Sequence, residues 1–120
     1  MPSIDELLKS HQIFTKKRNW DCFQSPKNLS MAISVEASEL LELFTWLSEE
    51  QSLNLSNDEI QKASHEIADI LLYLLRLSHV LGIDPLEAAK NKMIENEKNH
   101  PVEKSKEIAS SLAKRRPFKT

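Results

Sequence analysis

Glycine is almost absent from this sequence, which has one Gly and five Pro among 120 residues. Glycine supplies the positive φ values on which tight hairpin turns and glycine-rich phosphate-binding loops depend. The sequence therefore argues against a β-rich fold, a P-loop and a Rossmann dinucleotide site.

Cysteine and long apolar runs are also scarce. The single cysteine, Cys22, cannot form an intramolecular disulfide or a cysteine-based zinc site. The longest strongly apolar run, residues 67–75, is far shorter than the roughly 20 residues that span a bilayer. The first ten residues lack the apolar core of a secretory signal. We expect a soluble, cytoplasmic protein with no membrane partner.

Neither sign of charge dominates. Sixteen basic and eighteen acidic residues give a formal charge of −2, which argues against a protein that coats a nucleic acid polymer. The chain is 40% hydrophobic and 28% charged, which is typical of a folded chain, and its length suits one domain.

What remains is a series of helix signals. Apolar residues recur at helical spacing in four segments, and each segment begins at a residue that can cap a helix: Ser3, Ser25, Ser56 and Asp84. The second predicted helix runs to about Leu47, residues 48–57 form a connection, and the third helix stops at Gly82. Residues 19–26 are expected to form a loop.

These signals predict an all-α protein with a four-helix-bundle-like protomer. We assign residues 1–101 to one helical domain, with the fourth helix ending by Pro101. Residues 102–120 form a basic tail, expected to be partly helical around residues 108–112. Its basic residues are Lys104, Lys106, Lys114, Arg115, Arg116 and Lys119.

Acidic residues lie on the apolar faces of the second and third helices. At about 100° per residue, Glu36 lies in the middle of the apolar face of its helix, with Glu39 one turn further on the same side. Glu66 and Asp69 repeat this arrangement on the third helix. Two helices therefore direct an acidic i, i+3 pair toward the core.

Buried carboxylates need a partner, because an uncompensated buried charge costs several kcal/mol. Arg76 is the nearest cationic side chain on these faces. A divalent cation is the direct solution, and a set of oxygen ligands favours Mg²⁺ or Mn²⁺ over Zn²⁺. The alternative is that the acids face a solvated groove or pair with Lys and Arg of another helix.

The acidic pairs and the residues around them resemble a known family. Glu36-Ala-Ser-Glu39 and Glu66-Ile-Ala-Asp69 match the Glu-x-x-Glu, spacer, Glu-x-x-Asp pattern of the all-α nucleotide pyrophosphohydrolases of the MazG and dUTPase superfamily. The chain resembles the dCTP pyrophosphatase branch of MazG-like proteins from about His11 to Pro101. The other segments that carry the resemblance are residues 19–23, 26–29, 39–46 and 69–74.

The resemblance implies an enzyme that hydrolyses a nucleoside triphosphate between its α and β phosphates, giving a monophosphate and pyrophosphate. The implied substrate is dCTP or a modified dCTP, for removal of damaged nucleotides or control of the dCTP pool. Glu36, Glu39, Glu66 and Asp69 would then hold Mg²⁺, and Glu39 would prepare the attacking water.

The resemblance also implies a nucleotide-binding set. His11, Trp20 and Trp46 match positions that recognise the base, and aromatic faces can stack on a base. Tyr73, Lys92 and Asn96 match further positions of the nucleotide site. Core packing of the two tryptophans and solvation of Lys92 remain open alternatives. Residues 114–116 could close over phosphates, or belong to a solvated tail.

The apolar surface of the third helix predicts a partner subunit. Residues 67–75 are apolar on nearly every side of that helix, and one short chain cannot easily cover such a helix. We therefore expect a homo-oligomer. The resemblance implies a homotetramer, a dimer of dimers in which adjacent chains contribute to each site.

Two other classes compete with the enzyme interpretation. A non-catalytic helical adaptor or oligomerisation module would use the acids in salt bridges between helices. A ferritin-like di-iron bundle needs two Glu-x-x-His motifs on core helices, and the sequence has one, Glu97 to His100, at a polar helix end.

Overall fold

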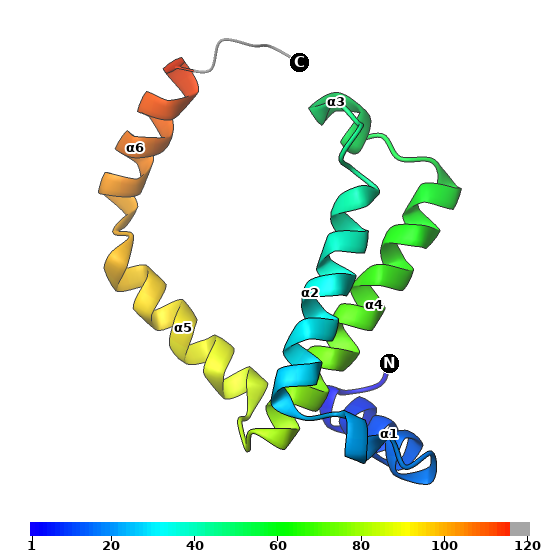
Figure 1. The fold of residues 1–120 in the computed structure, drawn as a ribbon. Coiled ribbons are helices and arrows are strands. Elements are labelled where there is room, and N and C mark those ends of the chain that lie inside the picture. The colour runs from blue at the N-terminus through cyan, green and yellow to red at the C-terminus, as the bar shows by residue number, and fades with distance from the viewer. Residues whose placement is uncertain (116–120) are drawn as a thin grey trace. The chain divides into compact units, whose positions relative to one another are not determined.

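The computed structural model describes residues 1–115 of the chain, and all regular elements within them are helical. In chain order they are α1 (Ile4–Lys17), the 3₁₀ helix η1 (Trp20–Phe23), α2 (Pro26–Glu42), α3 (Glu49–Ser52), α4 (Asn57–Val80), α5 (Pro85–Asn99) and α6 (Val102–Arg115) (Figure 1). The predicted all-α class is confirmed. The chain divides into two compact units, residues 1–83 and residues from Asp84 onward.

The predicted capping residues begin the helices. The side chains of Ser3, Ser25, Ser56 and Asp84 each accept a hydrogen bond from a backbone N–H in the first turn of the helix that follows. Each cap satisfies a donor that has no partner inside the helix. At the other end of α4, Gly82 takes a φ of 69°, which a residue with a Cβ adopts at a cost.

The first unit is built on a pair of long helices. α2 and α4 run side by side, and α1 packs near one end of α4 (Figure 1). Only Leu29 and Leu75 are fully buried apolar residues in this unit, at 1% and 2% exposure. Thr15 is also fully buried, and its hydroxyl donates a hydrogen bond to the backbone carbonyl of Gln12 at 3.0 Å.

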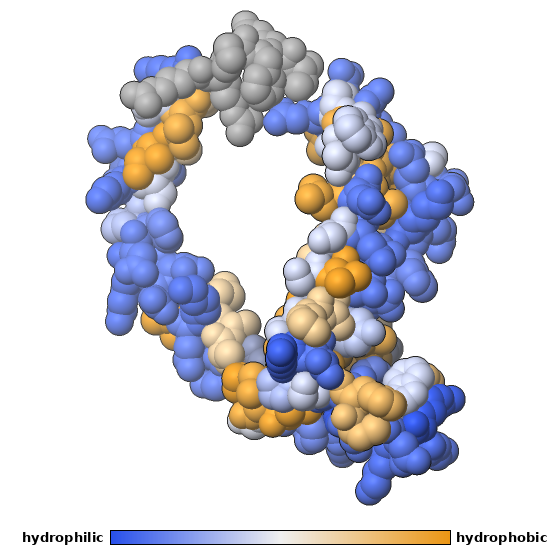
Figure 2. All heavy atoms as spheres, viewed as in Figure 1, coloured by the Kyte–Doolittle hydropathy of each residue, from blue (hydrophilic) through white to orange (hydrophobic). Residues whose placement is uncertain are grey.

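Large apolar side chains remain exposed on both long helices. On α4 most of them form one stripe, centred roughly 110° around the helix from Glu66. Its members are Ile60, Ile67, Leu71 and Leu74, which are 39% to 56% exposed. Met31 and Val35 are more than half exposed on α2, and Figure 2 shows orange, apolar surface over that helix. The first unit thus leaves an apolar surface open on both helices.

The first unit differs from the sequence predictions in three places. α2 ends at Glu42 and not near Leu47. After Glu42 the backbone N–H groups of Leu43 and Phe44 bond three residues back, to the carbonyls of Leu40 and Leu41, and form turns. The connection after it contains the single-turn helix α3, whose capping box joins Ser48 and Gln51. The expected loop at residues 19–26 contains η1.

The second unit contains α5 and α6. α5 begins at Asp84 and Pro85, as predicted, and ends before Pro101. The tail is helical from Val102 to Arg115, well beyond the expected short segment. Arg116 and Lys119 lie outside the described residues. Among the described helices, none combines the length and the apolar character that a membrane crossing requires.

Candidate metal and nucleotide site

Carboxylates of α2 and α4 meet between the two helices. One carboxylate oxygen from each of Glu36, Glu39 and Glu66 lies within 4.8 Å of the other two. A second group shares Glu66: ligand atoms of His65, Glu66 and Asp69 also lie within 4.8 Å of one another. We call Glu36, Glu39, Glu66 and Asp69 the acidic cluster. The i, i+3 spacing on each helix and the pairing of the helices bring these side chains together.

The acidic cluster has few partners of its own. Within residues 1–114, no Lys or Arg forms an ion pair with a cluster carboxylate, and the one contact with a basic side chain places Asp69 Oδ2 3.5 Å from His65 Nε2. The Oε2 atoms of Glu36 and Glu66 are buried without a hydrogen-bond partner. Such atoms are costly unless a ligand satisfies them. The donor set therefore fits a hard divalent cation.

Close approach of the carboxyls raises the pKa of two of these acids. The neighbouring carboxyl of Glu66, which can share a proton with Glu36, raises the pKa of Glu36, and loss of hydration raises it further. The carboxyl of Glu36 raises the pKa of Glu39, first through the same sharing and then through its charge. In the metal-free protein, ionisation of the cluster thus opposes folding.

The raised pKa values predict how the stability of the metal-free protein depends on pH. Because the folded state holds these protons to a higher pH than the unfolded chain, the cluster's contribution falls as the pH rises above about 4.5, the ordinary glutamate value. We expect the melting temperature in chelator to fall less between pH 5 and pH 7.5 in Glu36→Gln than in the wild type. Thermal unfolding followed by circular dichroism measures this difference.

Glu59→Gln is the matched control for this measurement. The backbone N–H of Ser56 lowers the pKa of Glu59 within the capping box, so this carboxyl stabilises the fold above its unfolded pKa and loses that contribution in acid. Its replacement should leave the cluster's pH dependence in place. An equal slope in the wild type and Glu36→Gln would contradict repulsion within the cluster.

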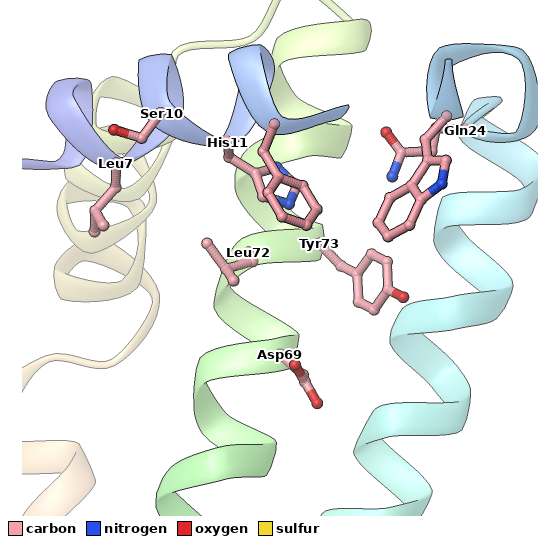
Figure 3. Close-up of a pocket in the computed structure, with 9 residues that line it drawn as sticks. Leu7, Ser10, His11, Gln24, Asp69, Leu72 and Tyr73 are labelled. Carbon is pink, nitrogen blue, oxygen red and sulfur yellow. The ribbon is translucent and has the colours of Figure 1, made fainter. Parts of the chain in front are cut away.

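An aromatic pocket of about 450 Å³ adjoins the cluster in the same unit. α1, η1 and α4 line it, and Asp69 belongs to both the pocket and the cluster (Figure 3). Its lining residues are Leu7, Ser10, His11, Phe14, Trp20, Gln24, Asp69, Leu72 and Tyr73. The volume is in the range of small-molecule sites.

Aromatic rings form one side of the pocket. The rings of His11 and Phe14 are stacked with centroids 6.2 Å apart, and Trp20 meets Phe14 edge to face at 5.3 Å. His11 Nδ1 is buried without a partner. Burial, and then the positive charge of Arg76, lower the pKa of His11. The imidazole is therefore neutral at pH 7 and offers one donor and one acceptor.

An ion pair with a buried arginine holds the segment that carries Trp20. Arg76 Nη2 on α4 donates to Asp21 Oδ1 on η1 at 2.6 Å, and Arg76 is only 7% exposed. The cation that the sequence offered as a partner for the acidic cluster thus pairs with Asp21. The consequence is a fixed position for η1 against α4.

The structure does not bring all the predicted site residues together. His11, Trp20, Tyr73 and Asp69 line one pocket. Trp46 follows the end of α2, is 91% exposed and does not line this pocket. Lys92 and Asn96 lie on α5 in the second unit, where Lys92 Nζ lies 3.7 Å from Glu95 Oε2.

Several residues of the site were missed from the sequence. His65 directly precedes Glu66, so its place beside the cluster could have been read from that spacing. Phe14 lies three residues after His11 on the same helix face, which also gave a usable signal. Gln24, and the pairing of Asp21 with Arg76, depend on how η1 packs and had no local signal.

Comparisons with known proteins identify the family of this chain. The MazG-like family profile matches residues 31–113, most of the chain. The chain belongs to the MazG-like family. A crystal structure of a pyrophosphatase from Archaeoglobus fulgidus superposes on this MazG-like chain with a TM-score of 0.79 and 39% identity, covering 84% of this chain and 94% of that one. The family resemblance seen in the sequence is confirmed.

Curated relatives of this MazG-like chain carry a more specific name. dCTP pyrophosphatase 1 of Bos taurus is 32% identical over 107 residues, which cover 88% of this chain and 63% of that protein. The Homo sapiens protein of the same name is 30% identical over 103 residues, or 84% of this chain and 61% of that protein. The chain thus spans about three-fifths of the length of these relatives.

Proposed function

We propose that this MazG-like chain is a Mg²⁺-dependent nucleoside triphosphate pyrophosphohydrolase. It cleaves between the α and β phosphates to give a nucleoside monophosphate and pyrophosphate, with dCTP or a base-modified dCTP as its substrate. One observation carries the proposal: Asp69 joins a cluster of carboxylates, two of which have buried oxygens without a hydrogen-bond partner, to an aromatic pocket in one protomer. The names of the curated relatives and of the structural neighbour support the same activity.

The acidic cluster would hold the metal. Glu36, Glu39, Glu66 and Asp69 supply the oxygen ligands that Mg²⁺ or Mn²⁺ prefers. When bound, the ion neutralises phosphate charge and lowers the pKa of coordinated water. Glu39 is the exposed member of its trio, so a water molecule can reach its carboxylate, which orients that water and accepts its proton.

The aromatic pocket would hold the nucleoside. Trp20 offers a ring face for stacking, which contributes about 1 to 3 kcal/mol per base in single-strand binding proteins. The neutral His11 and the hydroxyl of Tyr73 add polar contacts. A base here places the triphosphate near the carboxylates, because Asp69 lies at the border of both regions.

Oligomerisation would complete this arrangement. The exposed stripe on α4 and the apolar surface on α2 are typical of a protein–protein interface. We infer a homotetramer, a dimer of dimers. Trp46, which is 91% exposed in the protomer, would stack on the nucleotide once subunits associate, and Lys92 and Asn96 would bind phosphate or sugar.

The adaptor alternative finds less support. It requires salt bridges between helices at Glu36, Glu39 and Glu66, and in the described part of the chain these carboxylates make none. Their unpartnered oxygens would destabilise a bundle that binds no ligand.

Pyrophosphate release from a nucleotide panel tests the proposed function. The panel contains the canonical nucleoside triphosphates and 5-methyl-dCTP, each with Mg²⁺ and with excess chelator. We expect release that favours deoxycytidine nucleotides and stops in chelator. Activity on a nucleotide with another base would support the metal cluster and contradict the assignment of dCTP as the substrate. No release from any nucleotide by folded protein would favour the adaptor.

A further inference from the structure

Gln24 contributes an unsatisfied acceptor to the aromatic pocket. Its Oε1 atom is buried without a hydrogen-bond partner, and the residue lines the pocket together with Trp20 and His11. Figure 3 shows Gln24 on the opposite side of the pocket from His11, with its amide end directed inward. A buried amide oxygen without a partner costs on the order of 1 to 3 kcal/mol. A ligand that donates a hydrogen bond there would recover this energy.

The backbone around Gln24 is well anchored. The N–H of Gln24 donates to the carbonyl of Asp21 at 3.3 Å, and Asp21 is held by the buried Arg76. On its other side, Ser25 caps α2. Gln24 is therefore held between two fixed elements, and its backbone position beside the pocket is set before a ligand binds.

The chemistry of the pocket decides what this acceptor can recognise. A base that stacks on aromatic faces presents its hydrogen-bonding groups at its edge, in the plane of the ring. The amide oxygen accepts from an exocyclic amino group and repels a keto oxygen. Cytosine carries an amino group at position 4, where uracil and thymine carry a keto oxygen.

We propose that Gln24 determines base specificity by accepting a hydrogen bond from the 4-amino group of the pyrimidine, so that cytosine is selected over uracil. This inference rests on the proposed function for the identity of the substrate. Gln24 touches the base and takes no part in phosphate chemistry.

Two substitutions at Gln24 test this role in opposite directions. Gln24→Met keeps the length of the side chain and removes the acceptor, so the ratio of kcat/KM for dCTP to that for dUTP should fall on the order of tenfold. Gln24→Glu offers acceptors only, so this ratio should stay at or above the wild-type value. Because each ratio compares two substrates of one variant, a general loss of activity cancels.

Gln12→Met is the matched control. Gln12 is on α1, outside the pocket, and its amide nitrogen lies 3.0 Å from Nδ1 of His79. The same chemical change at this position should leave the ratio at its wild-type value. An unchanged ratio in Gln24→Met would overturn the assignment, and so would a ratio that falls equally in Gln24→Glu.

Binding of the two monophosphates separates this proposal from the proposed function. Calorimetric titration with dCMP and dUMP needs no turnover. We expect the wild type to bind dCMP more tightly, and Gln24→Met to lose most of that difference. If the wild type releases pyrophosphate from no nucleotide and still shows this difference, the hydrolase proposal fails and the role of Gln24 stands. Hydrolysis with equal binding of both monophosphates would overturn the role of Gln24 alone.

Discussion

Replacement of Glu39 by glutamine is expected to lower the rate of pyrophosphate release by about a thousandfold, equivalent to roughly 4 kcal/mol of transition-state stabilisation. The amide keeps the shape of the side chain and removes the negative charge that a metal ligand or a proton acceptor needs. Glu36→Gln removes a ligand from the same trio and should cause a loss of similar size. Steady-state assays at saturating Mg²⁺ measure both.

Glu42→Gln is the control for this loss of activity. Glu42 lies one turn beyond Glu39 at the end of α2, is exposed and belongs to neither group of potential metal ligands. Its replacement should leave the rate nearly unchanged. Because the neighbouring Glu36 carboxyl holds the pKa of Glu39 above its ordinary value, ionised Glu39 opposes folding, and the Glu39→Gln protein should unfold in chelator at a higher temperature than the wild type. A destabilised Glu39→Gln protein, or one that retains a tenth of the activity, would contradict the assigned role.

Replacement of Asp21 by alanine should reduce the free energy of unfolding by on the order of 3 kcal/mol, because it leaves the buried guanidinium of Arg76 without its counter-charge. Arg76→Met should cost less, about 1 kcal/mol, since the Asp21 side chain is 51% exposed and can be hydrated again. Urea unfolding at a fixed protein concentration measures both values. Equal losses in the two variants would show that the pair contributes through packing and not through charge.

A second readout connects this pair to the pocket. Asp21 follows Trp20 directly in η1, so loss of the pair should loosen the aromatic side of the pocket. We expect Asp21→Ala to raise KM for the nucleotide more than it lowers kcat, because the cluster carboxylates belong to α2 and α4 and none belongs to η1.

Local signals in the sequence predicted most of the helix boundaries. Ser3, Ser25, Ser56 and Asp84 begin helices because each satisfies its own first-turn donors, which needs no distant contact. The predicted end of α2 was wrong. Turns replace the helix after Glu42, although apolar residues continue at helical spacing to Leu47. The sequence also carried the cap of α3, as Ser48 followed by Gln51, and this signal was overlooked.

The candidate site was also predicted only in part from the sequence. Helical periodicity predicted that Glu36 and Glu66 face the core, because both lie on the apolar faces of their helices. The aromatic pocket did not follow, because its shape depends on where α1 and η1 meet α4. Arg76 is an example. Periodicity predicted that it lies near the acidic cluster, but in the structure it pairs with Asp21 of η1, 55 residues away in the sequence.

The capping residues at the helix starts also bear on how quickly the protomer forms. Each long helix carries its own start signal, and most contacts join residues close together in the chain. Folding rates rise as contacts become more local, and helical proteins of this kind fold within microseconds to milliseconds. The pair of α2 and α4 would therefore form early. Any later association of subunits would depend on chain concentration and would set the slower rate.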